Sequence, residues 1–260
     1  MKNPVRSIVR KASLGMAAGL ALTLGAGSAL AGRPLGIDVS SYQGLPNWSS
    51  VYADGVRWAF AKATEGNYFH DGSYTYNMTH GKSAGVQMGA YDFARPDLIS
   101  ANTEADYFWA FAGGYITTDG KSLYPMVDFE VFNGHVGYST YTAWMNAWSS
   151  RVKSKKSTFM HPVIYCSAGS GACDLIEYDL PGGIYLSAWI AHYNGENLYT
   201  GNPWDGCCSC CNAWQQGCGG QNWTYWQVSD TGAISGISGN VDLDAYALSL
   251  SELISYQGLH

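Results

Sequence analysis

Residues 124–130 read YPMVDFE, an apolar run that ends in two carboxylates separated by one residue. Such a run predicts a buried strand. Side chains alternate between the two faces of a strand, so Asp128 and Glu130 point the same way, roughly 6 to 7 Å apart. In parallel barrels the catalytic groups lie at the carboxyl ends of the strands, which is where both acids are found. We therefore expect this pair at the centre of the functional site.

A pair of neighbouring carboxyl groups is suited to acid–base chemistry. A close anion and partial burial raise the pKa of one member, which leaves one protonated acid beside one carboxylate. Hydrolysis of a glycosidic bond needs this combination. A solvated strand end or a cation site explains the short motif equally well.

The rest of the chain predicts the fold around this strand. The expected strands are Leu35–Val39, Val56–Ala63, Val86–Phe93, Tyr124–Glu130, Pro162–Cys166, Ile184–Ile190 and Trp223–Val228. The expected helices are Tyr74–Ala84, Ala101–Ala112, Thr140–Ser154 and Asp244–Ile254. Strands that alternate with helices predict parallel pairing through crossover helices. We predict a single-domain α/β fold, an irregular TIM-barrel-like (β/α) barrel with fewer helices than strands.

The amino-terminal segment has the pattern of an export signal. Its basic residues precede an apolar run, Leu14–Leu30, and Ala29 and Ala31 supply the small residues of a cleavage site. The run is short and rich in Ala and Gly, so a retained membrane anchor is the weaker interpretation. We predict a signal peptide at 1–31, one domain at 32–260, a secreted protein, and no membrane association after cleavage.

The charge balance narrows the range of partners. Residues 1–31 hold four of the fourteen basic residues and none of the twenty acidic ones, so the remainder carries a net charge of −10. This charge argues against nucleic acid and anionic membranes as partners. The chain also has ten Trp, nineteen Tyr and eight Phe. Most of these rings belong in the core, and we expect some to line a sugar-binding groove.

Seven cysteines in an exported protein indicate disulfides. Cys166 and Cys173 form a candidate local pair, and five more crowd into residues 207–218. That spacing matches no zinc ribbon or finger, and no histidine lies within it. We expect a disulfide-tied surface loop with one cysteine left over or joined between molecules, and neither a metal nor a cofactor.

Other acids lie at the ends of expected elements. Asp38 ends the first strand, and Asp242 and Asp244 precede the last helix. Helix capping is the alternative role for Asp244 and, less strongly, for Asp242. Because closure of a barrel brings its first and last elements together, these acids can meet over one cleft.

Seven stretches resemble glycoside hydrolase family 25, the Chalaropsis-type lysozymes, in that family's order. They are Gly36–Gly44, Phe60–Gly66, Gly89–Pro96, Pro125–Glu130, Ala188–Tyr193, Trp226–Val228 and Gly236–Leu243. The resemblance covers nearly all of residues 32–260. It implies a flattened (β/α) barrel with an acidic groove, a monomer, and peptidoglycan glycan strands as substrate.

The resemblance also implies roles for single residues. Glu130 corresponds to the proton donor, Asp128 to its electrostatic partner, and Asp38 and Asp242 to the rest of the acidic set. The groove-lining residues implied by the family are Tyr91, Trp189, Tyr193 and Trp226, although ordinary core packing explains each ring comparably well.

Three further features bear on the groove. Lys62 and Glu65 lie in a family motif and fit a structural ion pair. Asp92 stands where the family often has histidine, so we expect a change in groove charge or substrate preference. The cysteine-rich segment at 206–220 is foreign to the pattern and is expected to reshape one end of the groove.

Three other functions are weighed against the lysozyme hypothesis. Cysteine–histidine catalysis fits poorly, because the cysteines cluster away from His161 and His192. A chitinase-like hydrolase keeps the barrel and changes the bond that is cleaved. A glycan-binding module without activity is disfavoured by the presence of every expected carboxylate.

Overall fold

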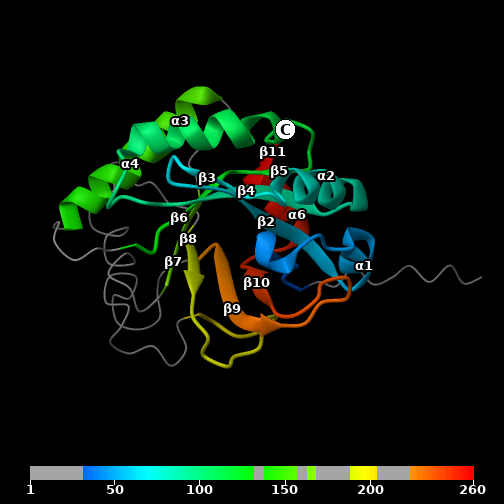
Figure 1. The fold of residues 1–260 in the computed structure, drawn as a ribbon. Coiled ribbons are helices and arrows are strands. Elements are labelled where there is room, and N and C mark those ends of the chain that lie inside the picture. Colours follow the sequence, from blue (N-terminus) through cyan, green and yellow to red (C-terminus); the bar gives the residue numbers. More distant parts are fainter. Residues whose placement is uncertain (1–31, 132–137, 157–162, 168–187, 204–222) are drawn as a thin grey trace, which may run out of the picture. The chain divides into compact units, whose positions relative to one another are not determined.

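Eight strands pair in a closed ring, so the fold is a barrel (Figure 1). The computed structural model describes residues 32–131, 138–156, 163–167, 188–203 and 223–260. In order around the ring the strands are β1 (Leu35–Val39), β2 (Val56–Glu65), β4 (Gln87–Phe93), β6 (Met126–Asp128), β7 (Val163–Ser167), β8 (Ala188–Ala191), β9 (Tyr225–Gly232) and β10 (Val241–Tyr246). Five α-helices are found among the described residues. The predicted irregular barrel with fewer helices than strands is confirmed.

The barrel is mixed and not wholly parallel. β1, β2, β4, β6, β7, β8 and β9 follow one another in parallel pairs, whereas β10 is antiparallel to both β9 and β1. Residues 233–240 join β9 to β10, too few for the crossover that a parallel pair needs. Gly236 and Gly239 take positive φ angles in this connection. The expectation of parallel pairing throughout was therefore wrong at β10.

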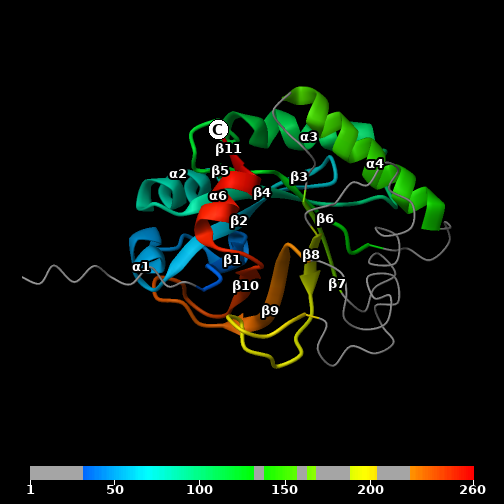
Figure 2. The ribbon, with the colours of Figure 1, turned by 180° about the vertical axis from the view of Figure 1, so that it is seen from behind.

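The described residues form five α-helices outside the ring of strands. They are α1 (Trp48–Ala53), α2 (Tyr74–Ala84), α3 (Ala101–Ala112), α4 (Tyr138–Lys155) and α6 (Leu250–Gln257). Figures 1 and 2 show α2, α3 and α4 along the same side, over the strands β2, β4 and β6. No helix in the described ranges is long and apolar enough to cross a membrane.

Five short elements accompany the ring of strands and its helices in the described residues. They are the strands β3 (Phe69–His70), β5 (Ser122–Leu123) and β11 (Gly258–Leu259) and the 3-10 helices η1 (Ser41–Gln43) and η2 (Gly113–Tyr115). β11 pairs with β5, and β5 pairs with β4, so the chain's last residues extend the sheet beyond the ring. These elements and α1 were not expected from the sequence.

Most expected elements agree with the structure to within a few residues. The expected strand 124–130 is shorter, as β6 ends at Asp128. The expected helix 244–254 was wrong in its first part, because β10 runs to Tyr246 and α6 begins only at Leu250. Of the expected strands 162–166 and 184–190, residues 162 and 184–187 lie outside the described residues.

The predictions for residues 1–31 and for most of the cysteines concern residues outside the described ranges. The signal-peptide segment is one of these, and so are Cys173 and the cluster at 207–218. Cys166 is described, and it is buried on β7.

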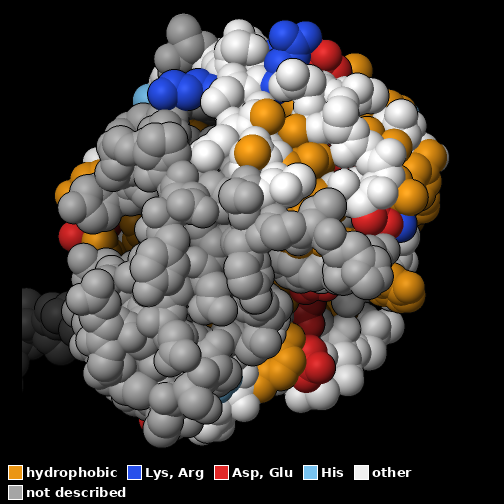
Figure 3. Space-filling view, turned by 90° about the vertical axis from the view of Figure 1, so that its left-hand side faces the viewer, with side chains coloured by type: hydrophobic (Ala, Val, Ile, Leu, Met, Phe, Trp, Pro, Cys, Tyr) orange, Lys and Arg blue, Asp and Glu red, His pale blue; other side chains and the backbone are white. Residues whose placement is uncertain are grey.

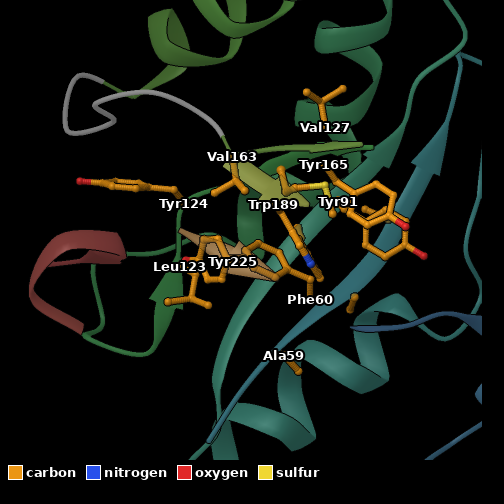
Figure 4. Packing of buried hydrophobic residues seen from close by; sticks show 14 of the residues in the cluster. Ala59, Phe60, Tyr91, Leu123, Tyr124, Val127, Val163, Tyr165, Trp189 and Tyr225 are labelled. Atoms are coloured by element: carbon orange, nitrogen blue, oxygen red, sulfur yellow. The ribbon is translucent and has the colours of Figure 1, made fainter. Parts of the chain in front are cut away.

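Aromatic side chains fill the interior of the barrel. Trp58, Phe60, Trp189 and Tyr225 contact one another with ring centroids 4.9 to 6.0 Å apart, and Figure 4 shows three of them converging from different strands. None of the four is measurably exposed to solvent. Rings of this size exclude water and close the barrel, so the structure has a packed core and no pore.

Two glycines make room for these rings. A Cβ atom on Gly89 would lie 2.2 Å from a ring atom of Phe60, and one on Gly36 would lie 2.1 Å from a ring atom of Trp58. Both distances are far shorter than a van der Waals contact, and both clashes are with rings held in a dense core.

We therefore expect Gly89→Ala to destabilise the protein by about 1–3 kcal/mol, the usual cost of overpacking a core. Chemical denaturation checks this value. Gly114→Ala is the control, because no heavy atom lies within 4 Å of its added Cβ. Equal stability of the two variants would contradict the packing argument.

A buried carboxyl group, that of Asp92, lies between the barrel and its helices. Asp92 on β4 accepts hydrogen bonds from Thr64 Oγ1 at 2.6 Å and from Trp148 Nε1 at 2.9 Å. It is fully buried, so it points away from the groove. Alternation along β4 sends Tyr91 inwards and Asp92 outwards, so Asp92 does not line the cleft, although its charge raises the pKa of Asp128.

Asp92 has a carboxyl neighbour in this layer. Glu104 on α3 is also buried and accepts a hydrogen bond from the Arg95 backbone at 3.0 Å. Burial raises the pKa of Asp92 to about 8, and burial together with the charge of Asp92 raises that of Glu104 to about 9. The folded protein thus keeps protons that the unfolded chain loses above about pH 4.

Because both folded-state pKa values are raised, these groups make stability fall as pH rises from about 4 to 9. Glu104→Gln removes one of them, so we expect the variant to gain thermal stability over the wild type increasingly from pH 5 to pH 9. Melting temperatures across this range test the prediction, with exposed Glu196→Gln as the control. Parallel curves for Glu104→Gln and the wild type would refute it.

Candidate active site

A cleft of about 370 Å³ lies at the carboxyl ends of the parallel strands, above the aromatic core. Its carboxylate residues are Asp38, Asp128, Glu130, Asp230 and Asp242, and its main aromatic residues are Tyr42, Tyr91, Phe93, Tyr165, Trp189 and Tyr193. The space-filling view shows acidic side chains grouped in a hollow beside hydrophobic ones (Figure 3). The lining is therefore both strongly acidic and rich in rings.

Asp128 and Glu130 lie side by side in this cleft. Asp128 ends β6 between Phe93 of β4 and Tyr165 of β7. It is buried, and its Oδ1 atom has no hydrogen-bond partner among the described residues. Burial, followed by the charge of Glu130, raises the pKa of Asp128 well above its usual range.

Glu130 follows the strand and is exposed to the cleft. Loss of hydration raises the pKa of Glu130, and the charge of Lys62 opposes the rise. The neighbouring Tyr165 hydroxyl opposes the rise more strongly than Lys62 does. The two acids thus differ in access: solvent and substrate reach Glu130 more readily than Asp128.

Asp38 and Asp242 form a second carboxyl pair across the cleft. They are directly opposite in the antiparallel register of β1 and β10. Burial, with the charge of Asp242 next, raises the pKa of Asp38 well above its usual range. Two carboxyl groups placed like this repel each other as anions, which favours a proton on one of them.

The capping roles considered for the last two acids are wrong. Asp242 and Asp244 both lie within β10, and α6 is capped by Ser249, whose side chain accepts from the Glu252 backbone. Asp244 is buried beneath the cleft, where its Oδ1 accepts a hydrogen bond from Trp189 Nε1 at 3.1 Å. It therefore holds Trp189, which forms part of the cleft floor.

Three of the four expected groove aromatics reach the cleft. Tyr91 and Trp189 are buried in its floor, and Tyr193 is half exposed at its side. Trp226 does not reach it: the side chain is fully buried and its Nε1 donates to the His192 carbonyl at 2.9 Å. Alternation along β9 turns Tyr225 inwards and Trp226 outwards, so its assignment to the groove was wrong.

The structure brings two further polar residues into the cleft. Tyr165 and Gln227 lie on the inward faces of β7 and β9, both nearly inaccessible to solvent. Their segments were expected to be strands, and strand alternation alone identifies which side chains point inwards. Sequence reasoning missed them because it had no means of telling which inward residues of distant strands lie next to Glu130.

Among the described residues, Lys62 is the one lysine or arginine that lines the cleft. Its Nζ lies 3.1 Å from Glu65 Oε2 and 4.6 Å from the centroid of the Phe93 ring. The structural ion pair expected for Lys62 and Glu65 is thus present. Although several acids share the cleft, no group of three His, Cys, Asp or Glu side chains in the described residues is arranged to hold a metal ion.

Comparison with known proteins places the chain in a family. The sequence pattern described as "Glycosyl hydrolases family 25" matches residues 37–237. The chain belongs to glycosyl hydrolase family 25. As a member of this family it is a glycoside hydrolase, which agrees with the carboxylate-lined cleft and with the resemblance seen in the sequence.

Individual relatives agree with this assignment. Lysozyme M1 of Streptomyces globisporus is 32% identical over 230 residues, covering 85% of this chain and 70% of the relative. The N,O-diacetylmuramidase of Chalaropsis is 31% identical over 138 residues, which is 50% of this chain and 64% of the relative. The crystal structure of the bacterial lysozyme from Streptomyces coelicolor superposes with a TM-score of 0.67 at 30% identity, covering 86% of this chain and 96% of that one.

Proposed function

We propose that this family 25 enzyme hydrolyses the β-1,4 bond between N-acetylmuramic acid and N-acetylglucosamine in bacterial peptidoglycan. Glu130 acts as the proton donor and Asp128 assists. Two of its relatives are a lysozyme and a muramidase by name. The observation that carries the proposal is an accessible carboxyl, Glu130, beside the buried Asp128, whose Oδ1 has no hydrogen-bond partner among the residues that the structure describes.

Proton donation by Glu130 requires that it stay protonated until the leaving oxygen arrives. Its raised pKa serves this purpose. Burial and the charge of Glu130 raise the pKa of Asp128, so the two acids are harder to ionise together than either is alone. One proton is therefore available for the leaving group.

The unpartnered oxygen of Asp128 suits the acetamido N–H of a bound sugar. An N–H donated to Asp128 stabilises its ionised form, which leaves the proton of the pair on Glu130. Substrate binding thus divides the roles of the two acids. The ionised Asp128 also stabilises positive charge that develops on the acetamido group in the transition state.

The placement of the acids favours participation of the substrate. A retaining enzyme with a protein nucleophile holds its two carboxyls about 5 to 5.5 Å apart on opposite sides of the bond. Asp128 ends β6 and Glu130 follows it two residues later, so both acids approach the sugar from one direction. The 2-acetamido group therefore attacks the anomeric carbon while Glu130 protonates the leaving oxygen. An inverting route, in which Asp38 or Asp242 activates water, is the alternative.

We also propose that the enzyme works outside the cell as a secreted monomer. Secretion is supported by the export pattern of residues 1–31, which lie outside the described residues, and by the location of the bacterial wall.

Clearing of a suspension of purified cell walls is the direct test of the activity. We expect Glu130→Gln to lose nearly all activity and Asp128→Asn to lose a factor on the order of 10² to 10³, both without loss of folding. Asp230→Asn, which removes an exposed carboxylate from the same cleft, is the control and should keep most of the activity. Wild-type activity in Glu130→Gln would overturn the assignment, and activity on chitin alone would indicate a chitinase-like enzyme.

The stereochemistry of the product tests the mechanism. Participation of the acetamido group inverts the anomeric carbon twice, so the first-formed reducing end should be the β anomer. Proton NMR during the first turnovers distinguishes the anomers before they equilibrate. An initial α anomer would instead support water activation by Asp38 or Asp242.

A further inference from the structure

Tyr42 is an aromatic residue that lines the cleft and yet is 94% exposed to solvent. Among the described residues no other large hydrophobic side chain is as exposed, and the next, Leu45, is 64% exposed. Tyr91, Tyr165 and Trp189 line the same cleft but are buried. The ring of Tyr42 therefore keeps its apolar faces in water, which is unfavourable until something covers them.

The backbone next to Tyr42 is held from inside the protein. The N–H of Ser41 donates to Asp71 Oδ2 at 2.8 Å. Asp71 is itself buried, and its Oδ1 accepts from the backbone N–H of Ser73 at 2.8 Å and from the Ser73 hydroxyl at 2.6 Å. A buried carboxyl with three hydrogen bonds thus fixes one end of η1, the short helix that carries Tyr42.

The residue on the other side of Tyr42 is held as well. Gln43 Oε1 accepts from the backbone N–H of Ser40 at 2.9 Å, and the Ser40 side chain caps η1 in return. Gln43 Nε2 also donates to the carbonyl of Asn240, in the connection between β9 and β10, at 3.3 Å. The exposed ring therefore extends from an ordered backbone, so a ligand that contacts it need not order the turn first.

A second exposed ring lies elsewhere in the cleft lining. Tyr193 is half exposed, and its hydroxyl donates to Gln227 Oε1 at 2.6 Å. Tyr42 follows β1 and Tyr193 follows β8, and the strands between these two, β9 and β10, carry Asp230 and Asp242 of the lining. The cleft thus combines buried rings and acids in its floor with exposed rings further out.

The chemistry of a β-1,4-linked amino-sugar strand matches this arrangement. Each pyranose ring presents C–H groups on its faces and hydroxyl or acetamido groups around its edge. A C–H face packs on the flat face of an aromatic ring, which removes apolar surface of both from water. A carboxylate offers no such surface, so the acids of the cleft cannot replace this contact.

The position of Tyr42 indicates which part of the strand it contacts. β1, which leads to Tyr42, and β6, which leads to Glu130, lie nearly opposite each other in the ring of strands. A polymer bound at Glu130 continues beyond the cleaved bond in both directions. Sugars further along it pass over the rim of the cleft, where Tyr42 is exposed.

We propose that Tyr42 is a binding residue on which one sugar ring of the glycan strand stacks, further along the strand than the bond that is cleaved. This inference rests on the proposed function, because it takes the peptidoglycan glycan strand as the ligand. The ring face makes the contact and the hydroxyl is not needed for it. Because Tyr42 is exposed, its replacement leaves the core intact.

Oxidation of tyrosines by hydroxyl radicals, measured by mass spectrometry, tests the contact directly. Glu130→Gln is the parent protein, so that solubilised glycan strands are bound and not cleaved. We expect saturating glycan to slow the oxidation of Tyr42 several-fold. Tyr256 on α6 is the control, because it is 56% exposed and is not part of the cleft lining. Its oxidation should be the same with and without glycan.

Calorimetric titration of the same parent with the same glycan measures what the contact is worth. We expect Tyr42→Ala to weaken binding about tenfold, as the loss of roughly 50 Å² of apolar contact predicts. Tyr42→Phe keeps the ring and should stay within about twofold of the parent, as should the control Tyr256→Ala. Equal losses in Tyr42→Phe and Tyr42→Ala would show that the hydroxyl is what binds, and would overturn the stacking contact.

The two measurements separate this inference from the proposed function. Glycan that binds the parent without protecting Tyr42, or with unchanged affinity in Tyr42→Ala, would refute the inference alone. If no glycan bound and the wild type did not clear cell walls, the proposed function would fail, and the inference with it.

Discussion

The antiparallel pairing of β10 with β1 is the constraint on which the site depends. It closes the barrel and sets Asp38 opposite Asp242 in the register of the two strands. The hairpin that carries β10 also brings β9 into the ring, which places Gln227 against Asp38. Without this closure the carboxylates of the first and last strands would lie apart, and Glu130 would face an open sheet edge.

The aromatic core below the cleft affects the pKa values of the acids that lie above it. The rings of Trp58, Phe60, Trp189 and Tyr225 exclude water from the middle of the barrel, so the acids above them are poorly hydrated on one side. Loss of hydration is the largest cause of the raised pKa values of all four family acids. A group of carboxyls that would repel one another as anions is thereby kept partly protonated. The same environment that makes a proton available for chemistry also lessens the repulsion that would otherwise destabilise the fold.

Much of the fold could be predicted because local sequence and global structure agree over most of the chain. Alternation and apolar runs located the strands from 35 to 93 and the helices at 74–84 and 101–112 almost to the residue. One failure has a clear cause. Aspartate is uncommon in strands, and the expected last helix took in residues 244–246, although pairing with β9 and β1 holds 241–246 extended. Tertiary pairing overrode local preference there.

By itself, the sequence determined the barrel class, the family, and four of the five acids that line the cleft in the described residues, because those depend on strand periodicity and on ordered motifs that survive without coordinates. Only the tertiary structure decided which side of each strand faces the cleft: it turned Trp226 and Asp92 away and turned Tyr165 and Gln227 towards Glu130. The physical reason is that a strand's alternation fixes relative facing along one segment, whereas closure of the ring selects which of its two faces is enclosed and which distant residues share it.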